Sequence, residues 1–96
     1  MKNISILVMY YLKPDTKDRF LSELLEAKIP ETFRKESGCL AYEYFVPAYD
    51  NSSNVVVLLE TWKSKEFQSV HLRQPNMRLL KEIKDKYVVH TEVKYL

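Results

Sequence analysis

The chain has 96 residues, 46% of them hydrophobic and 29% charged, and its 15 basic and 13 acidic side chains leave a formal net charge of +2. This composition predicts one globular domain over residues 1–96, and the scattered charge disfavours nucleic-acid binding, although a basic patch formed only by folding stays open. The single cysteine excludes an intrachain disulfide and fits a reducing cytoplasm, and no run approaches the roughly 20 apolar residues of a membrane span.

The first predicted element is a strand over residues 4–12, which is rich in β-branched and aromatic side chains. Both of its faces are largely apolar: one carries Ile4, Ile6, Val8 and Tyr10, and the other carries Ser5, Leu7, Met9 and Tyr11. Pro14 and Asp15 end the strand, and Asp15 or Thr16 is expected to cap the helix that follows.

An amphipathic helix is predicted next, because apolar residues recur every four positions at Leu21, Leu25, Ile29 and Phe33. Pro30 lacks a backbone N–H, so it should kink this helix or split it in two. Gly38 is the only glycine of the chain, and it is expected to end the helical region in a left-handed conformation.

The middle of the chain predicts a hairpin. Residues 40–46 form its first strand, with Leu40, Tyr42, Tyr44 and Val46 on one face, and residues 55–62 form its second. The polar residues 50–54 between them have the composition of a turn, so the two strands should pair. Residues 55–62 are the most apolar of the strands and should lie at the centre of a sheet.

A second helical region begins at Ser64 and is interrupted at Pro75, which predicts a short helix and then a longer one to about residue 86. Residues 87–96 close the chain as a fourth strand. The resulting β-α-β-β-α-β order predicts an α+β, ferredoxin-like fold. Its antiparallel sheet should have the strand order 4-1-3-2, with both helical regions on a single face.

The first and third strands are apolar on both faces, although the helices can cover only one face of the sheet. The uncovered face therefore needs a partner. A second copy of the chain is the commonest choice, with a ligand covering the face as the alternative. We expect a homodimer with a total interface above about 2,000 Å², to which residues 93–96 could contribute by reaching across to the partner.

Two segments carry a resemblance to a known family. Residues 36–43 read ESGCLAYE and residues 60–67 read ETWKSKEF, and His71 and Pro75 follow shortly afterwards. In this order they resemble the antibiotic biosynthesis monooxygenase (ABM) family. The resemblance implies a dimeric α+β barrel with a pocket in each subunit between sheet and helices. Known members of this family include cofactor-independent oxygenases, quinol monooxygenases, haem-degrading enzymes and an isomerase. The fold alone therefore does not determine the function.

The resemblance draws attention to the end of the third strand and to the helix after it. Trp62 could stack on an aromatic substrate, or it could be a core residue whose indole N–H finds a carbonyl group. His71 could hold a substrate hydroxyl or take its proton, or it could be a helix histidine without a task. The candidate substrate-binding residues, which could equally pack in the core or the dimer seam, are Tyr10, Tyr42, Tyr44 and Phe67.

These residues and the resemblance together favour a cofactor-independent monooxygenase that acts on a small aromatic molecule or a quinol. No G-x-G-x-x-G segment and no Cys/His cluster with zinc spacing is present, so we expect neither a cofactor nor a metal. The alternative is a non-catalytic ligand-binding or stress-response domain of the same fold. Haem degradation and isomerase activity are disfavoured because Asn76 stands where many relatives carry a second histidine. Cys39 as a nucleophile and a role for His90 are also disfavoured.

Overall fold

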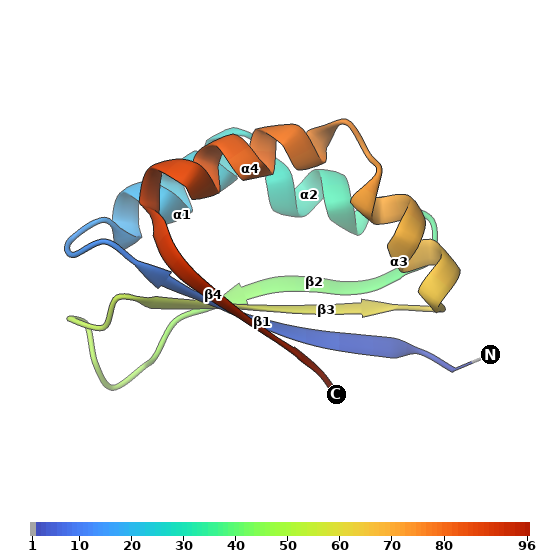
Figure 1. Cartoon of the computed structure of the whole chain (residues 1–96), viewed down its shortest axis with the longest axis horizontal. Helices are drawn as coiled ribbons and strands as arrows, with labels where there is room; N and C mark the ends of the chain where they lie inside the picture. Colours follow the sequence, from blue (N-terminus) through green and yellow to red (C-terminus); the bar gives the residue numbers. More distant parts are fainter. Residues whose placement is uncertain (1) are drawn as a thin grey trace.

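The elements follow one another along the chain in the predicted order (Figure 1). The computed structural model describes residues 2–96. Its elements are β1 (Ile4–Leu12), α1 (Lys17–Glu26), α2 (Ile29–Arg34), β2 (Cys39–Phe45), β3 (Val55–Trp62), α3 (Lys65–Leu72), α4 (Asn76–Tyr87) and β4 (Val88–Tyr95). The helices lie together on one face of the sheet, which confirms the α+β, ferredoxin-like arrangement (Figure 1).

The sheet has the strand order β2-β3-β1-β4, and every neighbouring pair is antiparallel. β1 and β3 are therefore central, as their two apolar faces predict. In the register between them Val8 pairs with Leu58, and both side chains are buried under the helices. Leu7 pairs with Leu59 on the opposite face, where both are only partly buried. The alternation along each strand thus divides the sheet into a covered and an uncovered face.

The first helical region is split at Pro30, as the sequence predicts. α1 ends at Glu26, Lys28 takes a left-handed φ of 58°, and Pro30 falls in the first turn of α2. A proline is tolerated there because the first amides of a helix have no helical acceptor to lose. The break directs Phe33 into the core, where it is fully buried.

The start of α1 differs from the prediction. Thr16 holds the N-cap position, but its hydroxyl donates to the carbonyl oxygen of Lys13 at 2.7 Å and makes no capping hydrogen bond. Asp15 lies before it with a left-handed φ of 61°. The prediction of a side-chain cap is wrong because Thr16 has φ −111° and ψ 0°, whereas a capping residue normally has an extended backbone that aims its side chain at the second or third helical amide.

Gly38 is left-handed, with a φ of 81°, as predicted. It lies beyond the C-cap Lys35 of α2, however, and it turns the chain into β2. A Cβ atom at this position would lie 2.2 Å from the Cγ atom of Phe67. Glycine is therefore required both by the backbone angle and by the phenyl ring of α3, which packs directly on the turn.

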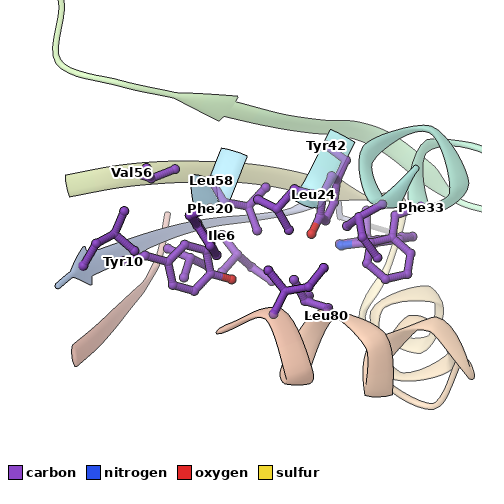
Figure 2. Packing of buried hydrophobic residues seen from close by; sticks show 14 residues of the cluster. Ile6, Tyr10, Phe20, Leu24, Phe33, Tyr42, Val56, Leu58 and Leu80 are labelled. Carbon is purple, nitrogen blue, oxygen red and sulfur yellow. The ribbon is translucent and has the colours of Figure 1, made fainter. Parts of the chain in front are cut away.

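The hydrophobic core fills the space between the helices and the covered face of the sheet. Ile6 and Leu58 from the central strands meet Leu80 from α4 and Phe33 from α2 in one cluster (Figure 2). Each fully buried leucine, isoleucine or phenylalanine contributes roughly 1.5–3 kcal/mol relative to an exposed one. This cluster packs the helices against the covered face of the sheet.

The face of the sheet away from the helices is apolar at its centre. Its partly buried side chains come from paired positions of the two central strands, namely Leu7, Met9 and Tyr11 of β1 and Leu59, Val57 and Val55 of β3. Phe45 at the edge, on β2, is 49% exposed. No element of residues 2–96 covers this surface, which we call the open face.

Candidate functional site

A cavity of about 230 Å³ lies between the covered face of the sheet and helices α3 and α4. An apolar cavity of about 150 Å³ can hold a benzene molecule, so this volume suits one aromatic ring with short substituents. The walls are mainly apolar, with a few polar groups. The lining residues are Ile6, Val8, Tyr10, Tyr42, Leu58, Glu60, Gln68, His71, Leu72, Met77, Leu80, Lys84, Thr91, Val93 and Tyr95.

His71 lines this cavity from α3 and is 1% exposed. Its Nδ1 atom lies 3.0 Å from Oε2 of Glu36, and its Nε2 atom lies 3.9 Å from Oε1 of Glu60. An ionised carboxylate can only accept a hydrogen bond, so the bond to Glu36 assigns the proton of a neutral imidazole to Nδ1. Nε2 is then the basic nitrogen, and it lies on the side of Glu60, which also lines the cavity.

Aromatic rings hold the imidazole of His71 in place. Trp62 stacks on its face, with ring centroids 4.6 Å apart and an interplanar angle of 29°. Phe33 meets it edge-on at 4.6 Å and 88°. The indole N–H of Trp62 donates to Oε1 of Glu60 at 2.9 Å, which also fixes that carboxylate. The imidazole is therefore oriented before any ligand arrives.

Trp62 is brought next to His71, as the sequence predicts, but it is fully buried and does not line the cavity. Its indole lies against the imidazole, and its N–H finds a carboxylate instead of a carbonyl group. The position follows from the alternation along β3, which places Trp62 on the covered face two residues after Glu60. In this geometry Trp62 lies behind the imidazole of His71 and is not among the residues that line the cavity.

Two of the predicted tyrosines line the cavity and the third does not. Tyr10 and Tyr42 point into it from β1 and β2, whereas Tyr44 lines a separate groove beside α1 and α2. The hydroxyl groups of Tyr42 and Tyr44 share a hydrogen bond of 2.9 Å. Burial raises the pKa of Tyr10 and of Tyr42 well above the usual value, so both phenols keep their protons and can donate to a ligand.

Three further sequence-based candidates lie outside the cavity lining. Phe67 packs against the turn at Gly38 and is core. Burial is the main cause that raises the pKa of the Cys39 thiol, which opposes the thiolate that a nucleophile needs. His90 is exposed on the open face, where its ring lies 5.5 Å from that of Tyr11.

Sequence reasoning missed three charged residues of the site: Glu36, Glu60 and Lys84. Glu36 sits in the connection between α2 and β2, and its Oε1 atom is buried without a hydrogen-bond partner among the described residues. Glu60 could have been found, because strand alternation puts it on the same face as Leu58 and Trp62. Glu36 and Glu60 also open the two segments that carry the family resemblance, which was a signal for both. Lys84 gave no such signal, since charged residues on helix surfaces are usually solvated.

The part of the chain that the structure describes contains no cluster of three or more His, Cys, Asp or Glu side chains placed to hold a metal ion. Within residues 2–96, none of the helices combines the length and apolarity needed to cross a bilayer. The polar side chains that line the cavity are one histidine, one glutamate, one lysine, one glutamine, one threonine and three tyrosines, and a second carboxylate, that of Glu36, lies behind the histidine.

The chain is thus an α+β protein with a ferredoxin-like sheet and a buried, carboxylate-bound histidine beside a mainly apolar cavity. Residues 3–83 match the sequence profile of the antibiotic biosynthesis monooxygenase family, and the chain belongs to that family. No curated protein sequence gives a significant match.

Solved structures share the fold along the whole chain. A protein from Pseudomonas aeruginosa has a TM-score of 0.83 at 17% identity, with 100% of this chain and 93% of that chain covered. A conserved protein from Methanosarcina mazei has a TM-score of 0.83 at 22% identity, with 100% and 92% covered. An antibiotic biosynthesis monooxygenase has a TM-score of 0.79 at 24% identity, with 97% and 95% covered. At these identities the likeness shows the fold alone.

Proposed function

We propose that the protein is a cofactor-independent monooxygenase that oxidises a small electron-rich aromatic molecule such as a quinol. The observation that carries this proposal is the buried His71, whose Nδ1 is hydrogen-bonded to Glu36 while the same ring lines a cavity large enough for one substituted ring. Membership in the monooxygenase family supports the reaction type. We also propose that the protein works in the cytoplasm as a homodimer joined through the open face.

The reaction that we propose begins with removal of a proton. Nε2 of His71 takes the proton of a substrate hydroxyl, and the carboxylate of Glu36 stabilises the imidazolium that forms. Tyr10 and Tyr42 supply hydroxyl groups that orient the aromatic ring of the substrate. Trp62 holds the imidazole of His71 in its orientation. The mainly apolar walls limit the water around the substrate, so the electron-rich phenolate forms in largely apolar surroundings.

The oxygen step balances without an added reductant. The deprotonated quinol supplies four electrons to O₂; a ring C–O bond forms, the O–O bond breaks and the ring C–H bond is lost. One oxygen atom stays on the ring as a hydroxyl group, which keeps the proton lost from the ring carbon. The other leaves as water with two protons, the one that His71 returns and the one from the second hydroxyl group of the quinol. A hydroquinone and O₂ thus give a hydroxyquinone and water. Because the substrate supplies all of the electrons, the reaction that we propose needs no flavin or nicotinamide, which suits a sequence without a dinucleotide-binding motif.

The test is oxygen uptake with 1,4-dihydroxynaphthalene, measured against the rate of its spontaneous oxidation in the same buffer. We expect His71→Ala to lower the enzymatic rate by about 100-fold or more, since a positioned general base contributes roughly 10²–10⁴ in rate. His90→Ala, on the open face, should keep the wild-type rate. Circular dichroism of each variant shows whether the fold is retained.

Unchanged turnover in a folded His71→Ala variant would remove His71 from the mechanism. If quinols bind but oxygen uptake does not exceed the spontaneous rate, the proposed monooxygenase activity is contradicted. The result would favour the alternative, a non-catalytic ligand-binding domain.

A further inference from the structure

Lys84 of α4 is a charged residue in the cavity wall that the proposed reaction does not use. It is partly buried, and its Nζ atom lies 5.7 Å from the centre of the Tyr10 ring. One turn earlier on the same helix, Lys81 is exposed and pairs with Asp85 at 2.7 Å. Lys84 itself forms no salt bridge within the described part of the chain, residues 2–96.

A partly buried ammonium without a carboxylate partner is costly, because it has lost water and gained only the weak attraction of an aromatic face. Burial is the largest cause that lowers the pKa of Lys84, and the like charge of Lys81 adds to it. Asp85 and Glu60 act in the opposite direction. The free cavity thus presents an incompletely compensated positive charge, and an anionic ligand would compensate it.

The register of the sheet separates this charge from the histidine. Across the sheet, Glu60 pairs with Ile6, and Thr91 pairs with Tyr10. Ile6 and Tyr10 are four residues apart on one face of β1, a distance of roughly 13 Å at the rise of a β-strand. The backbone of Glu60, beside the imidazole, thus lies towards one end of the cavity, and that of Tyr10, with Lys84 over its ring, lies towards the other, although Glu60 still acts on the pKa of Lys84.

We infer that the ligand of this cavity is an aromatic acid, whose carboxylate binds Nζ of Lys84 while its phenolic hydroxyl points towards His71. The two charged ends fix the direction in which the ring enters, because a carboxylate at the opposite end would face Glu60. The position of the ligand's phenolic hydroxyl rests on the proposed function. The contact between the ligand's carboxylate and Lys84 concerns binding only and does not depend on catalysis.

The experiment is calorimetric titration with 4-hydroxycinnamate and, separately, with its methyl ester, which has the same ring and hydroxyl but no charge. Lys84→Met keeps the length and apolarity of the stem and removes the ammonium. Because a hydrogen bond to a charged group is worth about 1.5–3 kcal/mol, we expect this variant to bind the acid roughly ten- to a hundredfold more weakly. Binding of the ester should stay within about twofold of wild type.

Lys81→Met is the matched control, since it removes an ammonium from the same helix but outside the cavity lining. Equal loss of acid binding in both lysine variants, equal affinity of the wild type for acid and ester, or no binding of the acid at millimolar concentration overturns the inference. Tight, Lys84-dependent binding of the acid, together with no oxygen uptake on 1,4-dihydroxynaphthalene above the spontaneous rate, supports this inference and contradicts the oxygenase. Enzymatic turnover of 1,4-dihydroxynaphthalene without Lys84-dependent binding of the acid supports the oxygenase and contradicts this inference.

Discussion

The chemistry of the site depends on how little freedom His71 has. Its ring is stacked on Trp62, touched edge-on by Phe33 and hydrogen-bonded through Nδ1 to Glu36. These contacts come from β3, from α2 and from the connection after α2, so the imidazole is oriented only when these segments and α3 have come together. Because the base is already oriented, no part of the free energy of substrate binding is needed to order it.

Glu36 is the positioning residue whose removal should separate orientation from binding. Glu36→Gln keeps the shape and removes the charge that stabilises the imidazolium. We expect kcat to fall about ten- to a hundredfold, equivalent to roughly 1.5–3 kcal/mol, with KM nearly unchanged because Glu36 does not line the cavity. Steady-state oxygen uptake checks this, and Glu36→Asp should recover part of the rate. A loss confined to KM contradicts the assignment.

The buried tyrosines predict how stability depends on alkaline pH. Burial raises the pKa of Tyr10 above its ordinary value of 10.0, so above about pH 10 the unfolded chain releases a proton that the folded chain keeps. The unfolded state then binds fewer protons, and the free energy of unfolding, constant for this group below pH 10, must fall as the pH rises. Urea unfolding between pH 8 and about pH 11.5 should show a shallower decline for Tyr10→Phe than for wild type.

Tyr49→Phe is the control for this experiment, because Tyr49 is fully exposed. Its curve should superimpose on that of the wild type. An identical decline for Tyr10→Phe and wild type means that the Tyr10 phenol is not held in its neutral form by the fold.

Part of the site could be predicted from residue types alone, and part could not. His71 and Trp62 were found because rare aromatic side chains at the end of a strand and on the next helix resemble a family motif. Glu36, although it opens one of the family segments, and Lys84 were missed because their roles depend on burial, which the fold creates and which composition does not reveal. Phe67 was named as a candidate, but its place beside Gly38 is set by the turn there and not by its helix pattern.

At the level of elements, the apolar and β-branched runs predicted the strands, the missing N–H of Pro30 predicted the split helix, and the β-α-β-β-α-β order predicted the order of the sheet. The predicted side-chain cap of α1 was wrong because it depends on the backbone angles of Thr16, and the preference of threonine for N-cap positions does not determine these angles. The second strand also ends earlier than expected, at Phe45, and the residues after it form the turn towards β3. The boundaries of helices and strands thus depend on hydrogen bonds that the spacing of apolar residues does not show.

The turn at Gly38 predicts a large effect of a small substitution. Gly38→Ala combines left-handed strain with a clash against the Phe67 ring, at costs of about 1–2 and about 1–3 kcal/mol. We therefore expect the free energy of unfolding to fall by about 2–5 kcal/mol at a fixed protein concentration. Urea unfolding measures it, with Ser37→Ala, an exposed neighbour, as the control. A loss below about 0.5 kcal/mol would mean that the turn can rearrange.

At the scale of the whole molecule, the open face is the feature that a monomer does not explain. Soluble monomers rarely expose a contiguous apolar patch above a few hundred Å². Burying apolar area gives roughly 25 cal/mol per Å², so a face the size of this sheet offers a large gross gain, which association entropy only partly offsets. A second copy placed face to face would cover Leu7, Met9 and Leu59 of each protomer.

Sedimentation velocity at micromolar concentration checks the proposed homodimer. The wild type should sediment as a species of twice 11.5 kDa. Val57→Glu puts a charge at the centre of the open face and should shift the population to monomer, whereas Leu25→Glu, on a side chain 64% exposed on α1, should leave the dimer intact. A wild-type monomer at this concentration contradicts the proposal.

The stacking of Trp62 on His71 has an optical consequence. The chain contains a single tryptophan, and its indole lies directly behind the imidazole that faces the cavity. All of the tryptophan emission therefore comes from one place, about one ring thickness from the site. The charge of that imidazole and the entry of a ligand beside it both alter the surroundings of the indole, so the protein carries a built-in fluorescent reporter of its own cavity.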